Sequence, residues 1–129
     1  MDRLKNRADF LRAARGIRRV VGAVTLEICP TPSKDRQGQD RQAKDCHPRV
    51  GFTASRKVGN AVTRNRAKRR LRAAAAQLLP LLGRGGHDYV LVARGTTVAR
   101  TFTALLSDIS GALNAAHRKL DATAGEPHA

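Results

Sequence analysis

The chain has 129 residues, enough for one domain with a modest core but not for two. Its 25 Lys and Arg residues against 10 Asp and Glu residues give a net charge of +15, which favours a polyanion such as nucleic acid as partner. No apolar run is long enough to cross a bilayer, and basic residues interrupt the beginning of the chain, so neither a membrane partner nor a signal segment is expected. We therefore predict a cytoplasmic protein.

The first third of the chain predicts a helix, a strand and a polar connection. Residues 2–15 carry apolar residues near one face and end at Gly16, which indicates a short helix. Val20 to Ile28 alternates as a strand does. Residues 31–48 contain hardly any apolar side chain, so we expect a mobile loop within one domain.

A second strand is predicted from Arg49 to Ser55, with Val50 and Phe52 on one face and Thr53 and Ser55 on the other. A helix should follow, beginning after an N-cap at Asn60 and ending near Leu79, where Pro80 closes it. Apolar residues at three-to-four spacing give this helix one buried stripe. The stripe consists of Val62, Ala67, Leu71, Ala74, Ala75 and Leu78.

The opposite side of the predicted helix is cationic. Six of the nine residues from Arg64 to Arg72 are Lys or Arg, and no Asp or Glu occurs between Asp45 and Asp88. An ordinary solvated face interleaves acids with bases, because pairs three and four apart stabilise a helix. Cations in the first turns also oppose the helix dipole. A polyanionic partner explains this pattern better than solvent exposure does.

The remaining chain predicts a strand and a helix. Tyr89 to Ala93 is almost continuously apolar, as in a central strand covered on both faces. The region from Thr101 to Leu120 has the strongest helical pattern, and a disordered tail is expected at 121–129. The order predicts a single α+β domain over residues 1–120, with a small sheet and a parallel strand pair joined by the basic helix.

No catalytic constellation is visible in the sequence. The few acids are scattered, the four His residues read as loop or surface residues, and a metal-dependent nuclease would need converging carboxylates. Cys29 and Cys46 lack the spacing of a zinc or redox site and are expected to be reduced. With four aromatic residues, of which only Phe10 is a candidate stacking surface, nucleic-acid binding should depend on phosphate contacts.

Several segments resemble the protein subunit of bacterial ribonuclease P. The run from Lys57 to Arg72 resembles the family's "RNR" signature, with Gly59-Asn60-Ala61-Val62 followed by Arg64-Asn65-Arg66 and Lys68-Arg69. Arg3-Leu4 with Asp9-Phe10, Arg49 to Ser55, and Asp88 to Arg94 resemble the flanking segments, so the resemblance covers about residues 3–120.

The resemblance implies a two-layer sandwich of a mixed four-stranded sheet and three helices, with a left-handed βαβ crossover as in the ribosomal-protein domain-2-like fold. It also implies an accessory subunit of an endoribonuclease that removes the 5′ leader of precursor tRNA. The RNA subunit would carry catalysis and hold Mg²⁺, and the protein would bind that RNA and the leader. No small-molecule substrate is implied.

Carried over by position, the signature implies which residues contact RNA. Those facing the RNA subunit would be Arg56, Lys57, Asn60, Arg64, Asn65, Arg66, Lys68, Arg69, Arg70 and Arg72. The leader would cross between the first helix and the sheet, near Phe10, Arg12, Thr53 and Ser55. Where many relatives have further aromatic residues this chain has Ala14 and Glu27, so charge from Arg12, Arg15 and Arg18 would replace stacking.

Two alternatives remain. A non-catalytic structural RNA-binding protein of the ribosomal type would be equally basic, but it gives no reason for the signature spacing. A self-sufficient nuclease would need the carboxylate cluster that this sequence lacks.

Overall fold

A computed structural model describes residues 2–32 and 47–124 of the chain. The predicted mobile loop and tail therefore lie largely outside the described residues, as does Cys46. The helices are α1 (Arg7–Ala14), the short 3₁₀ helix η2 (Arg56–Val58), α2 (Ala61–Leu82) and α3 (Phe102–Ala124). The strands are β1 (Asp2–Arg3), β2 (Ile17–Val21), β3 (Val24–Pro30), β4 (Arg49–Thr53) and β5 (His87–Ala93).

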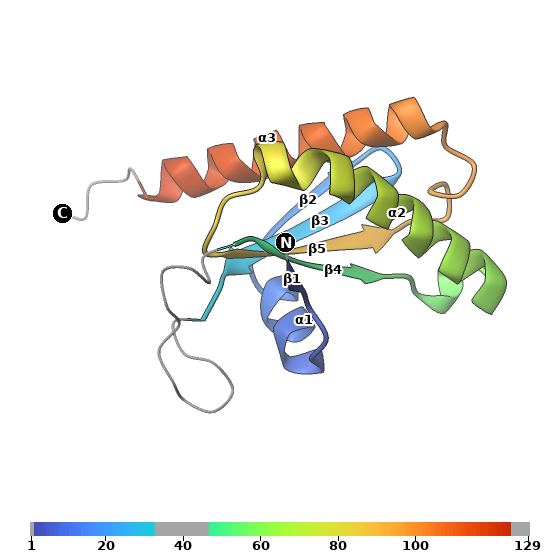
Figure 1. The fold of residues 1–129 in the computed structure, drawn as a ribbon, viewed down its shortest axis with the longest axis horizontal. Coiled ribbons are helices and arrows are strands. Elements are labelled where there is room, and N and C mark those ends of the chain that lie inside the picture. Colours follow the sequence, from blue (N-terminus) through green and yellow to red (C-terminus); the bar gives the residue numbers. More distant parts are fainter. Residues whose placement is uncertain (1, 33–46, 125–129) are drawn as a thin grey trace.

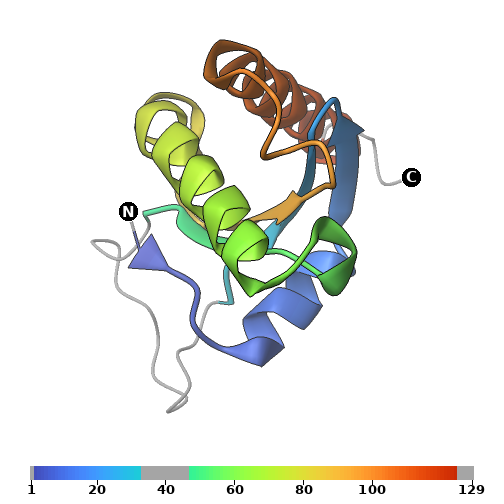
Figure 2. The ribbon, with the colours of Figure 1, turned by 90° about the vertical axis from the view of Figure 1, so that its right-hand side faces the viewer.

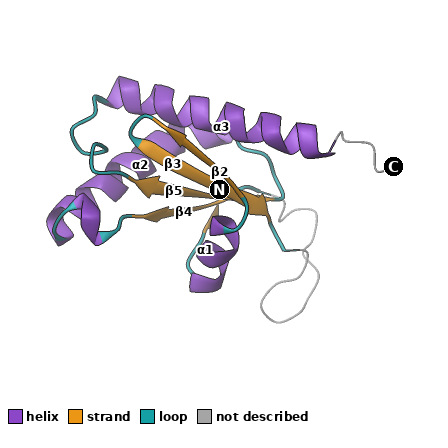
Figure 3. Cartoon of the chain, turned by 180° about the vertical axis from the view of Figure 1, so that it is seen from behind, coloured by secondary structure: helices purple, strands orange, loops and turns teal. Residues whose placement is uncertain are grey.

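The strands form one mixed sheet in the order β1-β4-β5-β3-β2. β4 and β5 are parallel and are joined by α2, as predicted, whereas β2, β3 and β5 pair antiparallel. β5 lies in the middle of the sheet (Figure 3), which explains its nearly continuous apolar sequence. The four longer strands are the predicted four-stranded sheet, and the two-residue β1 adds a short parallel edge.

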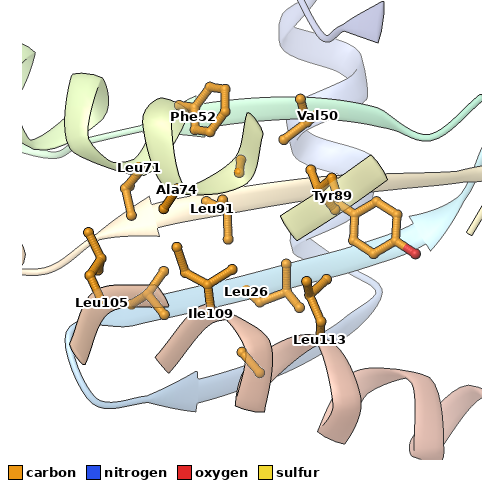
Figure 4. Packing of buried hydrophobic residues seen from close by; sticks show 14 of the residues in the cluster. Leu26, Val50, Phe52, Leu71, Ala74, Tyr89, Leu91, Leu105, Ile109 and Leu113 are labelled. Atoms are coloured by element: carbon orange, nitrogen blue, oxygen red, sulfur yellow. The ribbon is translucent and has the colours of Figure 1, made fainter. Parts of the chain in front are cut away.

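Helices cover the two faces of the sheet unequally. α2 and α3 lie side by side on one face, and α1 lies on the other (Figures 1 and 2). The main core lies between the sheet, α2 and α3, where Leu26, Val50, Tyr89 and Leu91 from the strands meet Leu71, Leu105, Ile109 and Leu113 from the helices (Figure 4). A smaller cluster of Leu4, Ala13, Cys29 and Val90, with Phe10 against it, fills the space under α1.

The predicted apolar stripe of α2 is buried in the middle of the helix, half-buried at Leu78 and exposed at its beginning. Ala67, Leu71, Ala74 and Ala75 are fully buried, but Val62 is 68% exposed. α2 begins beyond the end of β4 (Figure 1), so its first turn has no sheet beneath it. The assignment of Val62 to the core was therefore wrong.

Two predicted elements near the N-terminus differ from the structure. The first helix was expected over residues 2–15, but Asp2–Arg3 pairs with β4 and only Arg7–Ala14 is helical. The single strand predicted from Val20 to Ile28 is a hairpin of β2 and β3. Its turn places Gly22 at φ 55°, a conformation that glycine adopts at little cost.

Two predicted helix ends also differ. α2 continues through Pro80 to Leu82, because proline removes a single hydrogen-bond donor while Leu79 and Leu82 still pack against the core. α3 continues to Ala124, so the disordered tail predicted from residue 121 was wrong for residues 121–124. Arg84 donates two hydrogen bonds, of 2.7 and 3.1 Å, to the Asp121 carboxylate at this end of α3.

An ion network attaches α1 to the sheet. Asp88 on β5 is fully buried, and it accepts hydrogen bonds of 2.7 and 2.6 Å from Arg49 and of 2.7 Å from the Thr31 hydroxyl. Arg49 also reaches Asp9 of α1 at 3.4 Å, and Arg12 donates to Asp9 at 2.9 Å. Two carboxylates and two guanidinium groups thus neutralise one another where α1 meets β4 and β5.

The network predicts a loss of stability in acid. Burial raises the pKa of Asp9, but the hydrogen bond from Arg12 and the charge of Arg49 outweigh it, so this pKa lies below its ordinary value of 3.8. A carboxyl whose pKa is lowered by folding stabilises the fold above its unfolded pKa, and this contribution is lost as the pH falls through the folded pKa. We expect the melting temperature to fall below about pH 4 partly for this reason.

The variant Asp9→Asn should be destabilised by about 1–3 kcal/mol at neutral pH, because Arg49 and Arg12 lose a buried partner. It should also lose part of the acid dependence in thermal melts between pH 7 and pH 3. Asp121→Asn is the control, since Asp121 forms an exposed ion pair at the far end of α3. Equal melting curves for the two variants would contradict the role given to the network.

Candidate RNA-binding surface

The N-terminus of α2 is fixed by its cap. The Asn60 side chain accepts a hydrogen bond of 2.9 Å from the backbone N–H of Thr63, as predicted for an N-cap. Gly59 immediately before it has φ 149°, and a Cβ there would lie 2.9 Å from the Thr63 side chain. The turn from η2 into α2 therefore has a defined conformation, which fixes the direction of the side chains in the first turns.

All ten residues that the signature assigned to the RNA subunit lie on η2, its connection to α2, or α2 itself. Arg64, Lys68 and Arg70 are half-buried. The exposed members are Arg56, Lys57, Asn60, Asn65, Arg66, Arg69 and Arg72.

These cations have no internal counter-charge within residues 2–32 and 47–124. The ion pairs of this part of the chain involve arginines of α1, β4 and the later loops, and none involves a cation of η2 or α2. Arg70 instead donates to the backbone carbonyl of Arg100. The Nε atom of Arg64 is buried and has no hydrogen-bond partner among the described residues. The Nε atom of Arg70 is buried and unpaired in the same way, so the surface carries unneutralised charge and two free donors.

A small hollow lies at the beginning of this surface. It has a volume of about 170 Å³ and lies between the end of β4 and the first two turns of α2. Its lining consists of Ala54, Ala61, Arg64, Asn65 and Lys68. Two cations and an amide around one hollow suit an oxyanion such as a phosphate.

A larger cleft of about 590 Å³ opens where β3 begins and β5 ends, against η2. It brings Ser55 and Lys57, both predicted to contact RNA, together with Arg18 of β2 and Arg94 after β5. Arg94 also lies 3.5 Å from the hydroxyl of Thr25 through its Nη1 atom. Arg94 was not among the residues predicted to contact RNA, although a cation directly after a central strand, followed by Gly95, was a usable signal.

The other residues predicted to contact the leader do not line this cleft. One edge of the Phe10 ring lies against Gly51, where an added Cβ would come within 2.5 and 2.6 Å of its Cε1 and Cζ atoms. Arg12 belongs to the ion network with Asp9. Thr53 pairs with Val92, a residue of the cleft lining, so it lies beside the cleft. Phe10, Thr53 and the cleft occupy the same face of the sheet.

The histidines and Cys29 show no catalytic arrangement. His117 was predicted to be a surface or loop residue but is buried, with its Nε2 atom 2.7 Å from the Tyr89 hydroxyl. Burial and the nearby charge of Arg84 lower the pKa of His117, which keeps the ring neutral. Burial raises the pKa of the Cys29 thiol to about 11, so it is an unreactive core residue.

Neither a metal site nor a membrane-spanning element is found in the described part of the chain. No three His, Cys, Asp or Glu side chains among the described residues group closely enough to hold a metal ion. No helix within these residues is long and apolar enough to cross a membrane.

Comparison with known proteins gives one consistent match. The family model described as Ribonuclease P matches residues 1–117. The chain is 46% identical to the ribonuclease P protein component of Ruegeria pomeroyi, covering 88% of this chain and 85% of the relative. It is 49% identical to that of Paramagnetospirillum magneticum, covering 88% and 80%. For the protein of Caulobacter vibrioides the identity is 46%, covering 93% and 74%.

Solved structures match the fold. The RNase P protein of Staphylococcus aureus has a TM-score of 0.67 at 24% identity, covering 90% of this chain and 95% of that one. The RNase P protein of Thermotoga maritima has a TM-score of 0.65 at 21% identity, covering 92% and 97%. The predicted α+β architecture of three helices on a mixed sheet is thereby confirmed.

Asn60 allows the stability of α2 to be separated from its charge. Asn60→Ala removes the cap and should cost about 1 kcal/mol in the free energy of unfolding. Asn60→Asp keeps a capping oxygen and adds a charge that suits the helix dipole, so its stability should equal or exceed that of the wild type. Because that charge lies beside the cations of α2, the Asp variant should nevertheless bind RNA more weakly.

Thermal melting and a filter-binding or fluorescence-anisotropy titration would check both effects. A stable Asn60→Asp protein with unchanged affinity would show that the N-terminus of α2 does not contact RNA.

Proposed function

The chain belongs to the ribonuclease P protein family, as the protein component of the enzyme that processes the 5′ leaders of precursor tRNAs, and we propose that it binds the catalytic RNA through α2 and the leader through the cleft beside β5. The observation that carries this proposal is the uncompensated positive charge of η2 and α2. RNA phosphates would supply the missing counter-charge.

In this proposal the ten cationic and amide residues from Arg56 to Arg72 bind the RNA subunit. Three observations support this assignment: seven of the ten are exposed, none has a carboxylate partner among the described residues, and Arg64, Asn65 and Lys68 surround a hollow. Most contacts would be with phosphates, so they would position the protein without reading sequence.

The leader of precursor tRNA would lie along the α1 face of the sheet. Ser55, Lys57, Arg18 and Arg94 line the cleft at one end of this face, and Thr53 lies beside it. Phe10 would offer the exposed part of its ring further along. Arg12 would act mainly by holding α1 in place, since its charge is neutralised by Asp9.

Mg²⁺ enters this proposal as a cofactor of the RNA subunit. The described residues provide no cluster of carboxylate, His or Cys ligands that fits the ion. The chain's own contribution is positive charge, which brings RNA strands together without supplying ligands to a metal.

The proposal also takes residues 1–120 as one functional domain. It takes the cytoplasm, where precursor tRNA is made, as the location of the protein.

Reconstitution with the cognate RNA subunit tests the assignment of α2. The intact protein should stimulate accurate leader removal at low Mg²⁺, whereas protein alone should cleave nothing. The double variant Arg66→Gln with Arg69→Gln removes two exposed cations of α2 and should weaken binding to the RNA subunit. A plot of its log K against log salt should have a slope that is less steeply negative than that of the wild type, by about 1.4–1.8.

The matched control is Arg118→Gln with Lys119→Gln, which removes the same charge from an exposed part of α3. If both double variants lose affinity equally, net charge rather than the α2 surface governs binding. If the wild-type protein gives no stimulation, the accessory role itself is wrong for this chain.

The cleft near Arg94 predicts an effect on the binding of precursor tRNA that is separate from the binding of the RNA subunit. Arg94→Gln should weaken binding of the reconstituted enzyme to precursor tRNA by roughly threefold to tenfold, as expected for one charged contact. Binding to mature tRNA, which has no leader, should stay unchanged. Titrations with both RNAs would check this, with Arg118→Gln as control, and an equal loss for both RNAs would contradict a leader contact.

A further inference from the structure

We propose that Arg3 is an additional phosphate contact for the RNA subunit, and that Arg3, Arg72 and the ring of Phe52 extend the cationic side of α2 onto the edge of the sheet. This inference rests on the proposed function of α2. It adds a residue from the opposite end of the chain and a second structural element to that surface.

The backbone holds Arg3 in a defined position. β1 pairs in parallel with β4, with Asp2 opposite Arg49 and Arg3 opposite Val50. The next residue, Leu4, donates a backbone hydrogen bond of 2.8 Å to Val50 and is buried in the small cluster under α1. Since successive side chains of a strand point to opposite faces, burial of Leu4 on the α1 face turns Arg3 towards the α2 face. β1 lies at the sheet edge on the side of α2 (Figure 2).

Two guanidinium groups meet at one aromatic ring there. The Cζ atom of Arg3 lies 5.8 Å from the centroid of the Phe52 ring, and that of Arg72 lies 5.9 Å from it. Phe52 is 8% exposed, so its ring is a rigid part of the core surface. Both arginines are exposed, and neither forms an ion pair within the described residues. The ring orients the two cations by cation–π contact, but nothing described neutralises their mutual repulsion.

A phosphate fits this arrangement. Arginine presents a planar fork of donors that suits phosphate oxygens, and stacking on a ring limits its motion before binding. One phosphate close to both guanidinium groups would attract each of them and offset the repulsion between them. A carboxylate of the protein could do the same, but the ion pairs of the described residues lie elsewhere.

The position of Arg72 selects the RNA subunit as the occupant. Arg64, Lys68 and Arg72 are spaced by four residues and so lie along one side of α2, each about 6 Å further along the axis. Arg3 continues this row beyond Arg72, onto β1. The cleft proposed for the leader opens on the other face of the sheet, where Thr25 and Val92 line it. A strand following the row would therefore be the one bound by α2.

The variants Arg3→Gln, Arg3→Lys and Arg118→Gln in the full-length protein test this inference. Arg3→Gln should bind the RNA subunit roughly threefold to tenfold more weakly. A plot of its log K against log salt should have a slope that is less steeply negative than that of the wild type, by about 0.7–0.9. Arg3→Lys should keep the slope but not the full affinity, because an ammonium neither stacks nor binds in a fork. Arg118→Gln, which changes an exposed cation of α3, should match the wild type in both quantities.

Thermal melts of each variant would establish that the fold is kept. Unchanged affinity and slope for Arg3→Gln, while the wild type binds and stimulates the RNA subunit, would overturn this inference and leave the function of α2 intact. Failure of the wild type to bind would instead refute the proposed function. A loss confined to precursor tRNA, with normal binding of the RNA subunit, would make the leader the occupant and also overturn the inference.

Discussion

α2 is held to the sheet and to α3 by one narrow apolar side, and this packing determines which way the cations of this helix face. Ala67, Leu71, Ala74 and Ala75 have no exposed surface. Three of these four side chains are alanines, which let the helix lie close to the strands and leave long basic side chains to cover its flanks. With the buried side fixed, the cations on the other positions of α2 face outward from the core. A helix so rich in like charges gains little from its own side-chain pairs, so its stability depends on tertiary packing and on the Asn60 cap.

The two faces of the sheet are built by different forces. The α2 and α3 face is closed by hydrophobic burial around Tyr89 and Leu91. α1 has only eight residues and covers a small cluster, so the ion network through Arg49 and Asp88 supplies much of its attachment. Because α1 covers one end of its face, the other end stays open as the cleft near Arg94. A short helix fixed by charge thus leaves room for a ligand that a longer helix would exclude.

Local signals explain which features could be predicted from the sequence. The hydrophobic patterns of β5 and of α3 each arise within a single element, so both elements could be predicted. The Asn60 cap and the charged side of α2 also follow from the spacing of residues along the chain. The β2–β3 turn was missed because its stabilising contacts come from distant residues: Ala23 donates to Asp108, and Thr97 donates to Ala23. Burial of His117 depends in the same way on Tyr89. The family match also decides against a ribosomal-type structural protein, which composition alone could not do.

Four of the described carboxylates are placed so that the charge of the proposed RNA-binding surface on α2 stays uncompensated. Asp9 and Asp88 neutralise arginines under α1, and Asp108 pairs with Arg100 while accepting a hydrogen bond from Ala23. Asp121 pairs with Arg84 near the end of α3. Each of these acids joins elements that are distant in sequence, and none pairs with a cation of α2. Acids distributed evenly would stabilise α2 by neighbouring pairs but would weaken its attraction for phosphates. The fold therefore uses these acids to join its elements, and α2 keeps a concentration of positive charge that no carboxylate of the described residues pairs with.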